Sequence, residues 1–131
     1  MTYPTTTAVY AALLALIYVG LSGWVVAGRV SGDVLHGDGD AALQKRIRSQ
    51  ANFSEYVPVA LVLVALLEAG GAAHVLIQGL LLVLVVARLL HPVGMFAPKN
   101  SPRQFACRGG GIIATFGVIL VAAVALLIRA A

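Results

Sequence analysis

Charged residues are scarce in this chain of 131 residues: Asp, Glu, Lys and Arg together make up 11%, whereas 60% of the residues are hydrophobic. A soluble domain usually has about 25% charged and about 45–50% apolar residues. With a mean hydropathy of +0.96, the composition excludes an ordinary soluble globular protein. It also excludes intrinsic disorder, which requires low hydrophobicity and high charge. The length allows a single domain over residues 1–131.

Cysteine is nearly absent as well. The single thiol, Cys107, excludes a disulfide framework within the chain and a zinc site built on several thiolates. The three histidines are too dispersed in the sequence to suggest a metal site. The chain has no GxGxxG, P-loop, CxxC, HExxH or GxSxG motif, and only its net charge of +4 would suit nucleic acid. We therefore expect neither a metal nor a nucleic-acid partner.

Long apolar stretches separate the few charged residues. No Asp, Glu, Lys or Arg occurs in residues 1–28, 56–67, 69–87 or 109–128. A helix of about 20 apolar residues crosses a hydrocarbon core about 30 Å thick. We therefore predict an all-α fold, an integral-membrane four-helix bundle. Its spans are expected at about residues 5–28, 45–68, 72–92 and 104–129, with Asp40 able to cap the second helix.

Basic residues are distributed unevenly between the connections of this bundle. Eight of the nine belong to or flank the first and third connections: Arg29, Lys45, Arg46, Arg48, Arg88, Lys99, Arg103 and Arg108. Only Arg129 falls on the other side. The positive-inside rule places those two connections in the cytoplasm and both termini outside. We expect an integral protein of a bacterial inner membrane, whose basic side can also attract anionic lipids.

Polar groups occur at membrane depth in the second predicted span. At 100° per residue, Arg48, Asn52 and Glu55 share one helix face. An ionised side chain at that depth costs at least about 2.5–3.5 kcal/mol on insertion scales, so it faces a partner, a cavity or a ligand. Two interpretations are open. One is a ligand site; the other is a structural contact in which Glu55 neutralises Arg48 or a basic group on another helix.

A second polar pair ends the third predicted span. Arg88 and His91 lie three residues apart and share a face. We interpret Arg88 as the structural ion-pair partner of Glu55. His91 either hydrogen-bonds a ligand, acts as a base, or is a satisfied histidine between helices. Arg103 opens the fourth helix, where it either strengthens the attraction of the helix N-terminus for anions or serves only membrane topology.

The motif Arg48-x-x-x-Asn52-x-x-Glu55-Tyr56-x-Pro58, which opens the second of four spans, resembles the MAPEG family. These are membrane-associated proteins in eicosanoid and glutathione metabolism. The segment from Arg48 to Tyr56 is similar to the leukotriene C4 synthase version of the motif. The end of the third span resembles the matching segment of microsomal prostaglandin E synthase.

The resemblance runs from about Val9 to the C-terminus. It implies a homotrimer of four-helix protomers with glutathione bound at each subunit interface, open to the cytoplasm. By resemblance, seven residues would bind glutathione: Arg29, Arg48, Gln50, Asn52, Glu55, Tyr56 and His91. Arg29 would reach the site from the neighbouring subunit. Arg103 is the best match for the family arginine that stabilises the glutathione thiolate, as a cation beside a thiol does.

The resemblance predicts a membrane-bound glutathione transferase, or a peroxidase-like enzyme, that directs a thiolate at a lipophilic electrophile at the cytoplasmic membrane boundary. Met95 and Phe105 stand where family enzymes often carry a tyrosine and a polar residue. A non-catalytic membrane protein that binds a lipid or a partner is therefore an alternative. A small proton-coupled exporter is a weaker one, because the polar residues lie at one end of the helices rather than at the midplane.

Overall fold

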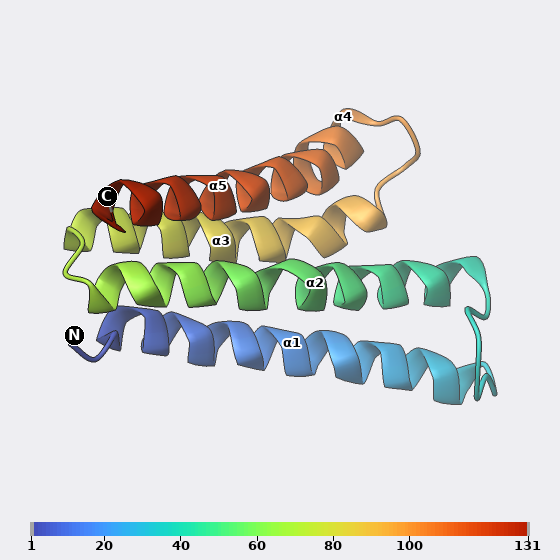
Figure 1. The fold of residues 1–131 in the computed structure, drawn as a ribbon. Coiled ribbons are helices and arrows are strands. Elements are labelled where there is room, and N and C mark those ends of the chain that lie inside the picture. Colours follow the sequence, from blue (N-terminus) through green and yellow to red (C-terminus); the bar gives the residue numbers. More distant parts are fainter. Residues whose placement is uncertain (1, 131) are drawn as a thin grey trace.

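A computed structural model describes residues 2–130, which form a helical bundle without strands (Figure 1). The elements are α1 (Thr5–Ser31), α2 (Ala41–Ala69), α3 (His74–Met95), α4 (Pro102–Gln104), the π-helical turn η1 (Phe105–Gly109) and α5 (Gly110–Ala130). The last three elements follow one another directly and form one continuous helical segment. Four helical segments are thus long and apolar enough to cross a membrane, which agrees with the predicted fold class.

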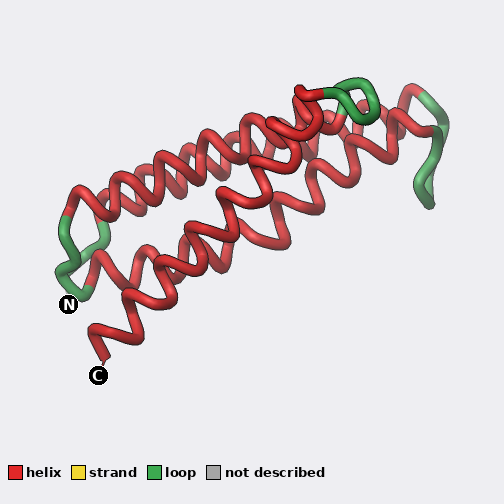
Figure 2. Tube along the Cα trace, turned by 90° about the horizontal axis from the view of Figure 1, so that it is seen from above, coloured by secondary structure: helices red, strands yellow, loops and turns green. Residues whose placement is uncertain are grey.

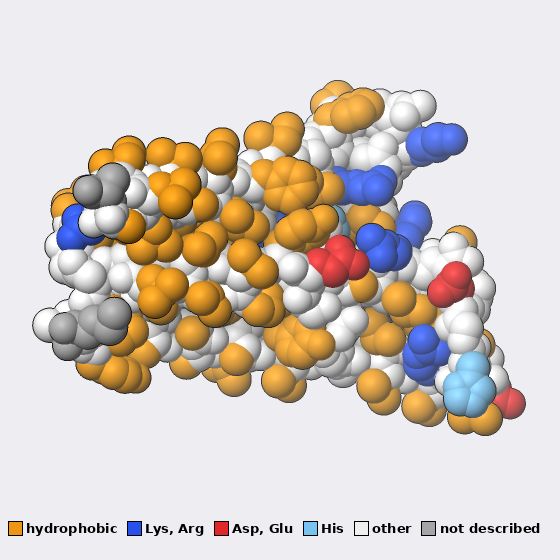
Figure 3. Space-filling view, viewed as in Figure 1, with side chains coloured by type: hydrophobic (Ala, Val, Ile, Leu, Met, Phe, Trp, Pro, Cys, Tyr) orange, Lys and Arg blue, Asp and Glu red, His pale blue; other side chains and the backbone are white. Residues whose placement is uncertain are grey.

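The two ends of the bundle differ in their content of basic residues. The basic end, as we call it, contains the connections 32–40 and 96–101, and the hairpin end contains the connection 70–73. The start of α1 and the end of α5 both lie at the hairpin end (Figures 1 and 2). On the face seen in Figure 3, most Lys and Arg side chains gather toward the basic end, and hydrophobic side chains cover much of the rest.

Short polar side chains fix where two of the helices begin. The Asp40 carboxylate accepts a hydrogen bond from the Leu43 amide at 2.7 Å, which confirms its predicted capping role. Helix α2 consequently begins at Ala41, ahead of the expected position near residue 45. The Ser101 hydroxyl accepts from the Gln104 amide at 3.1 Å, and Pro102 occupies the first turn, where its missing N–H is not needed.

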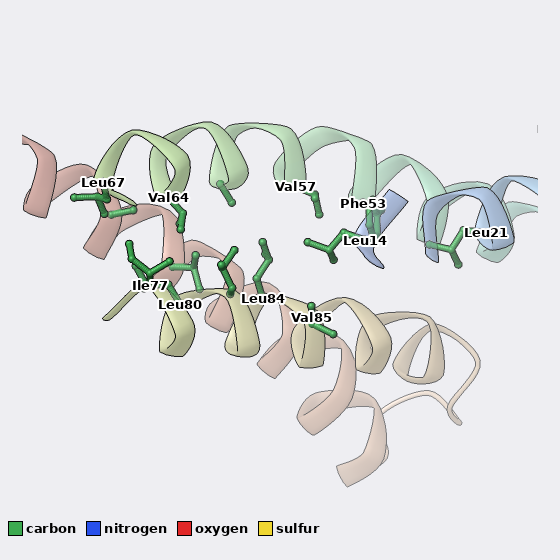
Figure 4. Packing of buried hydrophobic residues seen from close by; sticks show 14 residues of the cluster. Leu14, Leu21, Phe53, Val57, Val64, Leu67, Ile77, Leu80, Leu84 and Val85 are labelled. Atoms are coloured by element: carbon green, nitrogen blue, oxygen red, sulfur yellow. The ribbon is translucent and has the colours of Figure 1, made fainter. Parts of the chain in front are cut away.

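Apolar side chains at helical spacing form the core between the helices. One face of α2 contributes Phe53, Val57, Ala60, Val64 and Leu67, all at most 5% exposed. This series repeats every three or four residues, as expected for a helix with one buried stripe. Leucine, isoleucine and valine side chains of α1, α3 and α5 pack against that stripe (Figure 4). Pro58 lies outside it, on the exposed side of α2, and does not end the helix.

At the hairpin end, one carboxylate joins α1 to α2. Glu68 accepts three hydrogen bonds: from the Thr6 amide at 2.8 Å, and from the amide and the hydroxyl of Thr7 at 2.7 Å each. The first turn of a helix has amides without partners inside the helix, and Glu68 satisfies two of them in α1. A negative charge is also favourable at that end of the helix dipole. The contact therefore fixes the register of α1 against α2.

We expect Glu68→Ala to lower the free energy of unfolding by about 1–2 kcal/mol, because the substitution removes a charged cap from the start of α1. Thermal unfolding of the purified protein in detergent measures the effect. The matched control is Asp38→Ala, which removes an exposed carboxylate in the connection 32–40. Equal midpoints for the two variants would contradict the capping role.

Candidate functional site

Residues from α2, α3 and η1 converge near the basic end in a group that we call the polar cluster: Arg48, Asn52, Glu55, Tyr56, Arg88, His91 and Arg108. The ring of Tyr56 meets Phe116 of α5 edge-on, with centroids 5.2 Å apart. Gly94 of α3 packs against the backbone of Arg108, and Gly111 of α5 packs against His91. Five of the eight predicted binding and catalytic residues, together with the predicted structural residue Arg88, thus lie in one region.

The most buried charged group of the cluster is Arg88, which is 2% exposed. Its Nη1 donates to Asn52 Oδ1 at 2.6 Å, and its Nη2 donates to the Gly111 carbonyl at 3.0 Å. We predicted an ion pair between Arg88 and Glu55. This prediction is wrong, since no such pair occurs among residues 2–130. Asn52 points from α2 toward α3, whereas Glu55 lies on the open flank of α2 and is 44% exposed.

The Gly111 carbonyl, one of the two acceptors of Arg88, lies where α3 and α5 are in close contact. A Cβ atom at Gly111 would lie 2.9 Å from the Ala87 carbonyl oxygen, and one at Gly94 would collide with the backbone of Arg108. Only glycine permits these distances, because the helices meet backbone to backbone. The Gly111 carbonyl, which also accepts from the Thr115 hydroxyl at 2.8 Å, is thereby brought to Arg88.

In contrast to Arg88, the ionised pair on α2 is open to its surroundings. Arg48 Nη1 lies 3.7 Å from Glu55 Oε1, and the two side chains are 59% and 44% exposed. The geometry therefore matches the interpretation in which Glu55 neutralises Arg48. An exposed pair contributes little to stability. Its charges remain available to a ligand that carries both a carboxylate and an ammonium group.

Two polar atoms of the cluster lack partners among the described residues. His91 is 3% exposed, and neither its Nδ1 nor Nε of Arg88 has a hydrogen-bond partner within residues 2–130. Buried polar atoms in proteins are nearly always hydrogen-bonded to protein or to water. These two atoms thus retain unused hydrogen-bonding capacity inside the bundle.

Two of the predicted binding residues lie away from the cluster. Gln50 Nε2 donates to the Tyr18 hydroxyl on α1 at 2.8 Å. Arg29 Nη1 donates to the Gly37 carbonyl in the connection 32–40 at 3.0 Å. Within one chain, both residues therefore face α1 or its connection, and neither joins Arg48 and Glu55.

The two arginines of the fourth span lie on different sides of α3. Arg103 is exposed and lines a groove that also contains Trp24, Pro92 and Phe96. Arg108 lies in η1, where its backbone packs against α3 next to the polar cluster. Sequence reasoning missed Arg108 because it assigned this residue to membrane topology alone. The glycines that follow it at 109–111 are the one signal of a close helix contact there.

Comparison with known proteins shows the family of the chain. The model of the MAPEG family matches residues 7–128. The chain belongs to the MAPEG family. The inner membrane protein YecN of Escherichia coli strain K12 is 36% identical over 115 residues, which are 87% of this chain and 84% of YecN. YecN of strain CFT073 matches equally well. No solved structure matches the chain significantly.

Membership of the MAPEG family confirms the resemblance inferred from the α2 motif, and with it the four-helix membrane bundle. The match includes every residue of the polar cluster, as well as Arg29 and Arg103. The protein is therefore a MAPEG-family membrane protein, and its polar cluster is the candidate functional site.

Arg88 and Asn52 should be energetically coupled. We expect Arg88→Met and Asn52→Leu each to lower the free energy of unfolding by about 2–3 kcal/mol, because each leaves a buried polar group without its partner. The double variant should cost at least about 1 kcal/mol less than the sum of the two single variants. Unfolding in detergent measures all three, with Lys99→Met as an exposed control. Additive losses would contradict the coupling.

Proposed function

We propose that this MAPEG-family protein is a glutathione transferase of a bacterial inner membrane. Its basic end faces the cytoplasm and both termini lie outside. This orientation is supported by the basic residues, of which Arg129 alone lies at the hairpin end, bonded to the Gly70 carbonyl at 2.6 Å. The location is supported by the relatives, which are named inner membrane proteins. The substrates are glutathione and a lipophilic electrophile that enters from the membrane.

The observation that carries the proposal is the exposed Arg48–Glu55 pair on α2. Glutathione has two carboxylates and one ammonium group. The planar guanidinium of Arg48 suits a carboxylate, which it can bind through two parallel hydrogen bonds. The Glu55 carboxylate suits the ammonium group. A ligand with both charges can replace the contact between Arg48 and Glu55 without leaving either residue unpaired.

A complete site of this composition requires a second copy of the chain. Gln50 and Arg29 point toward α1 and its connection, whereas Arg48 and Glu55 lie on the other flank of α2. All of these residues can contact one ligand only if Arg29 and Gln50 come from a neighbouring chain. This supports a homo-oligomer, which the family resemblance makes a homotrimer. Each interface would cover one pair of exposed charges that would otherwise contact lipid at a considerable cost.

The thiol of bound glutathione needs a nearby cation to become a thiolate. We assign this role to Arg108, because it lies beside His91 in the polar cluster, whereas Arg103 lies in the groove on the other side of α3. A thiolate held beside Arg108 could attack a lipophilic electrophile or reduce a peroxide.

Isothermal calorimetry with glutathione tests the binding step. We expect Arg48→Ala and Glu55→Gln each to weaken binding about tenfold or more, because each removes a charge-assisted hydrogen bond. Lys99→Ala, an exposed cation of the connection 96–101, should bind as the wild type does. Wild-type protein that is folded but does not bind glutathione would refute the proposal and favour the non-catalytic alternative.

The ultraviolet absorbance of the thiolate tests which arginine activates glutathione. With saturating glutathione, the wild type should show a thiolate signal that Arg108→Ala loses, while Arg103→Ala retains it. The opposite result, loss in Arg103→Ala alone, would support the assignment made from the sequence and overturn ours. A signal that survives in both variants would exclude thiolate stabilisation by either residue.

A further inference from the structure

A second recess lies at the basic end, on the side of α3 opposite the polar cluster. It is a groove of about 340 Å³ between α1, α3 and the connection that follows α3. Its lining is apolar, including Trp24, Pro92 and Phe96, except for the guanidinium of Arg103. The rings of Trp24 and Phe96 lie 5.0 Å apart at a tilt of 37° and form an aromatic floor.

Two further cations border the aromatic floor. Lys45 Nζ lies 5.4 Å from the centroid of Phe96, and the Arg46 guanidinium lies 5.2 Å from that of Trp24. Arg46 Nη1 also donates to the Trp24 carbonyl at 3.1 Å, which fixes its position against α1. None of the described residues that line the groove is acidic. The groove therefore combines an apolar floor with an uncompensated positive charge at its edge.

We propose that this groove binds one anionic phospholipid. The phosphate contacts Arg103 and Lys45, and the first part of the acyl chains lies on Trp24 and Phe96. The groove is located where the apolar surface of the bundle meets its basic end, which is the level of lipid headgroups. Basic groups near that level attract anionic lipids.

The shape and the charge of the groove together select this ligand class. A soluble anion would satisfy Arg103 and Lys45 but would leave the aromatic floor exposed. A neutral or zwitterionic lipid would cover the floor but would not offset the cations that surround it. Only a ligand with a net negative headgroup and an apolar chain uses both features.

The proposed lipid site is separate from the glutathione site and does not depend on it. Pro92 of α3 and Phe96, which directly follows α3, face the groove, whereas His91 and Gly94 of α3 face η1, α5 and the polar cluster. A lipid in the groove would contact α1, α3 and the start of the fourth span, and would stabilise the basic end by binding the folded state.

Native mass spectrometry of the full-length protein in detergent tests the proposal. The probes are dioleoyl phosphatidylglycerol and dioleoyl phosphatidylcholine, which share acyl chains and differ in headgroup charge. The wild type should bind one phosphatidylglycerol in preference to phosphatidylcholine. Arg103→Gln should reduce that preference about fivefold. The matched control is Lys99→Gln, which removes a neighbouring exposed charge outside the groove lining and should keep the preference.

Three results would overturn the proposal. Equal binding of the two lipids by the wild type would show that headgroup charge is not recognised. An equal loss of preference in Lys99→Gln and Arg103→Gln would show that the preference for phosphatidylglycerol comes from the general charge of the surface. Full competition by glycerol 3-phosphate would show that the acyl chains contribute nothing and that the groove binds a soluble anion.

Phe96→Leu, which removes one ring of the aromatic floor and leaves the charges, should weaken binding of both lipids.

Discussion

A guanidinium buried among membrane-spanning helices must have its donors satisfied within the bundle, since an unpaired charge there costs several kcal/mol. Arg88 meets most of this requirement through its two terminal nitrogens, which donate to a side-chain oxygen from α2 and to a backbone carbonyl from α5, while its Nε has no partner among residues 2–130. Three helices must therefore hold one relative position for a single side chain to be accommodated. Gly111 allows the necessary approach, because any larger residue would push α5 away from the Ala87 carbonyl.

Because Arg88 bonds to Asn52, the Arg48–Glu55 pair is not needed to neutralise Arg88. Had Arg88 paired with Glu55, the carboxylate would have been committed to the fold, and Arg48 would have lacked its partner. Because Asn52 satisfies Arg88 instead, Glu55 and Arg48 stay together on an exposed flank. The structural and the ligand-binding interpretations of the polar residues are thus compatible. In the site that we propose, Arg88 and Asn52 hold the helices in place, and Arg48 and Glu55 offer charges to a ligand.

The sequence predicts what depends on local chemistry. Runs without charge specify the four spans, Asp40 specifies the start of α2, and the spacing of Arg48 and Glu55 places them on one face. It cannot predict the partner of Arg88, which depends on the relative rotation of α2 and α3 and hence on packing along both helices. The π-helical turn η1 is equally hard to predict: the glycines at 109–111 signal a close helix contact, but they do not show that the backbone of Arg108 packs against Gly94 of α3.

We propose that the fixed Arg88 contact supports a separate, exposed site for glutathione on α2. The decisive measurement is an experimental structure of the protein with glutathione. We expect glutathione between Arg48 and Glu55 at an interface between two copies of the chain, with Arg88 still bonded to Asn52 and the Gly111 carbonyl. Glutathione bound elsewhere, or Arg88 released from Asn52 to contact the ligand, would contradict it.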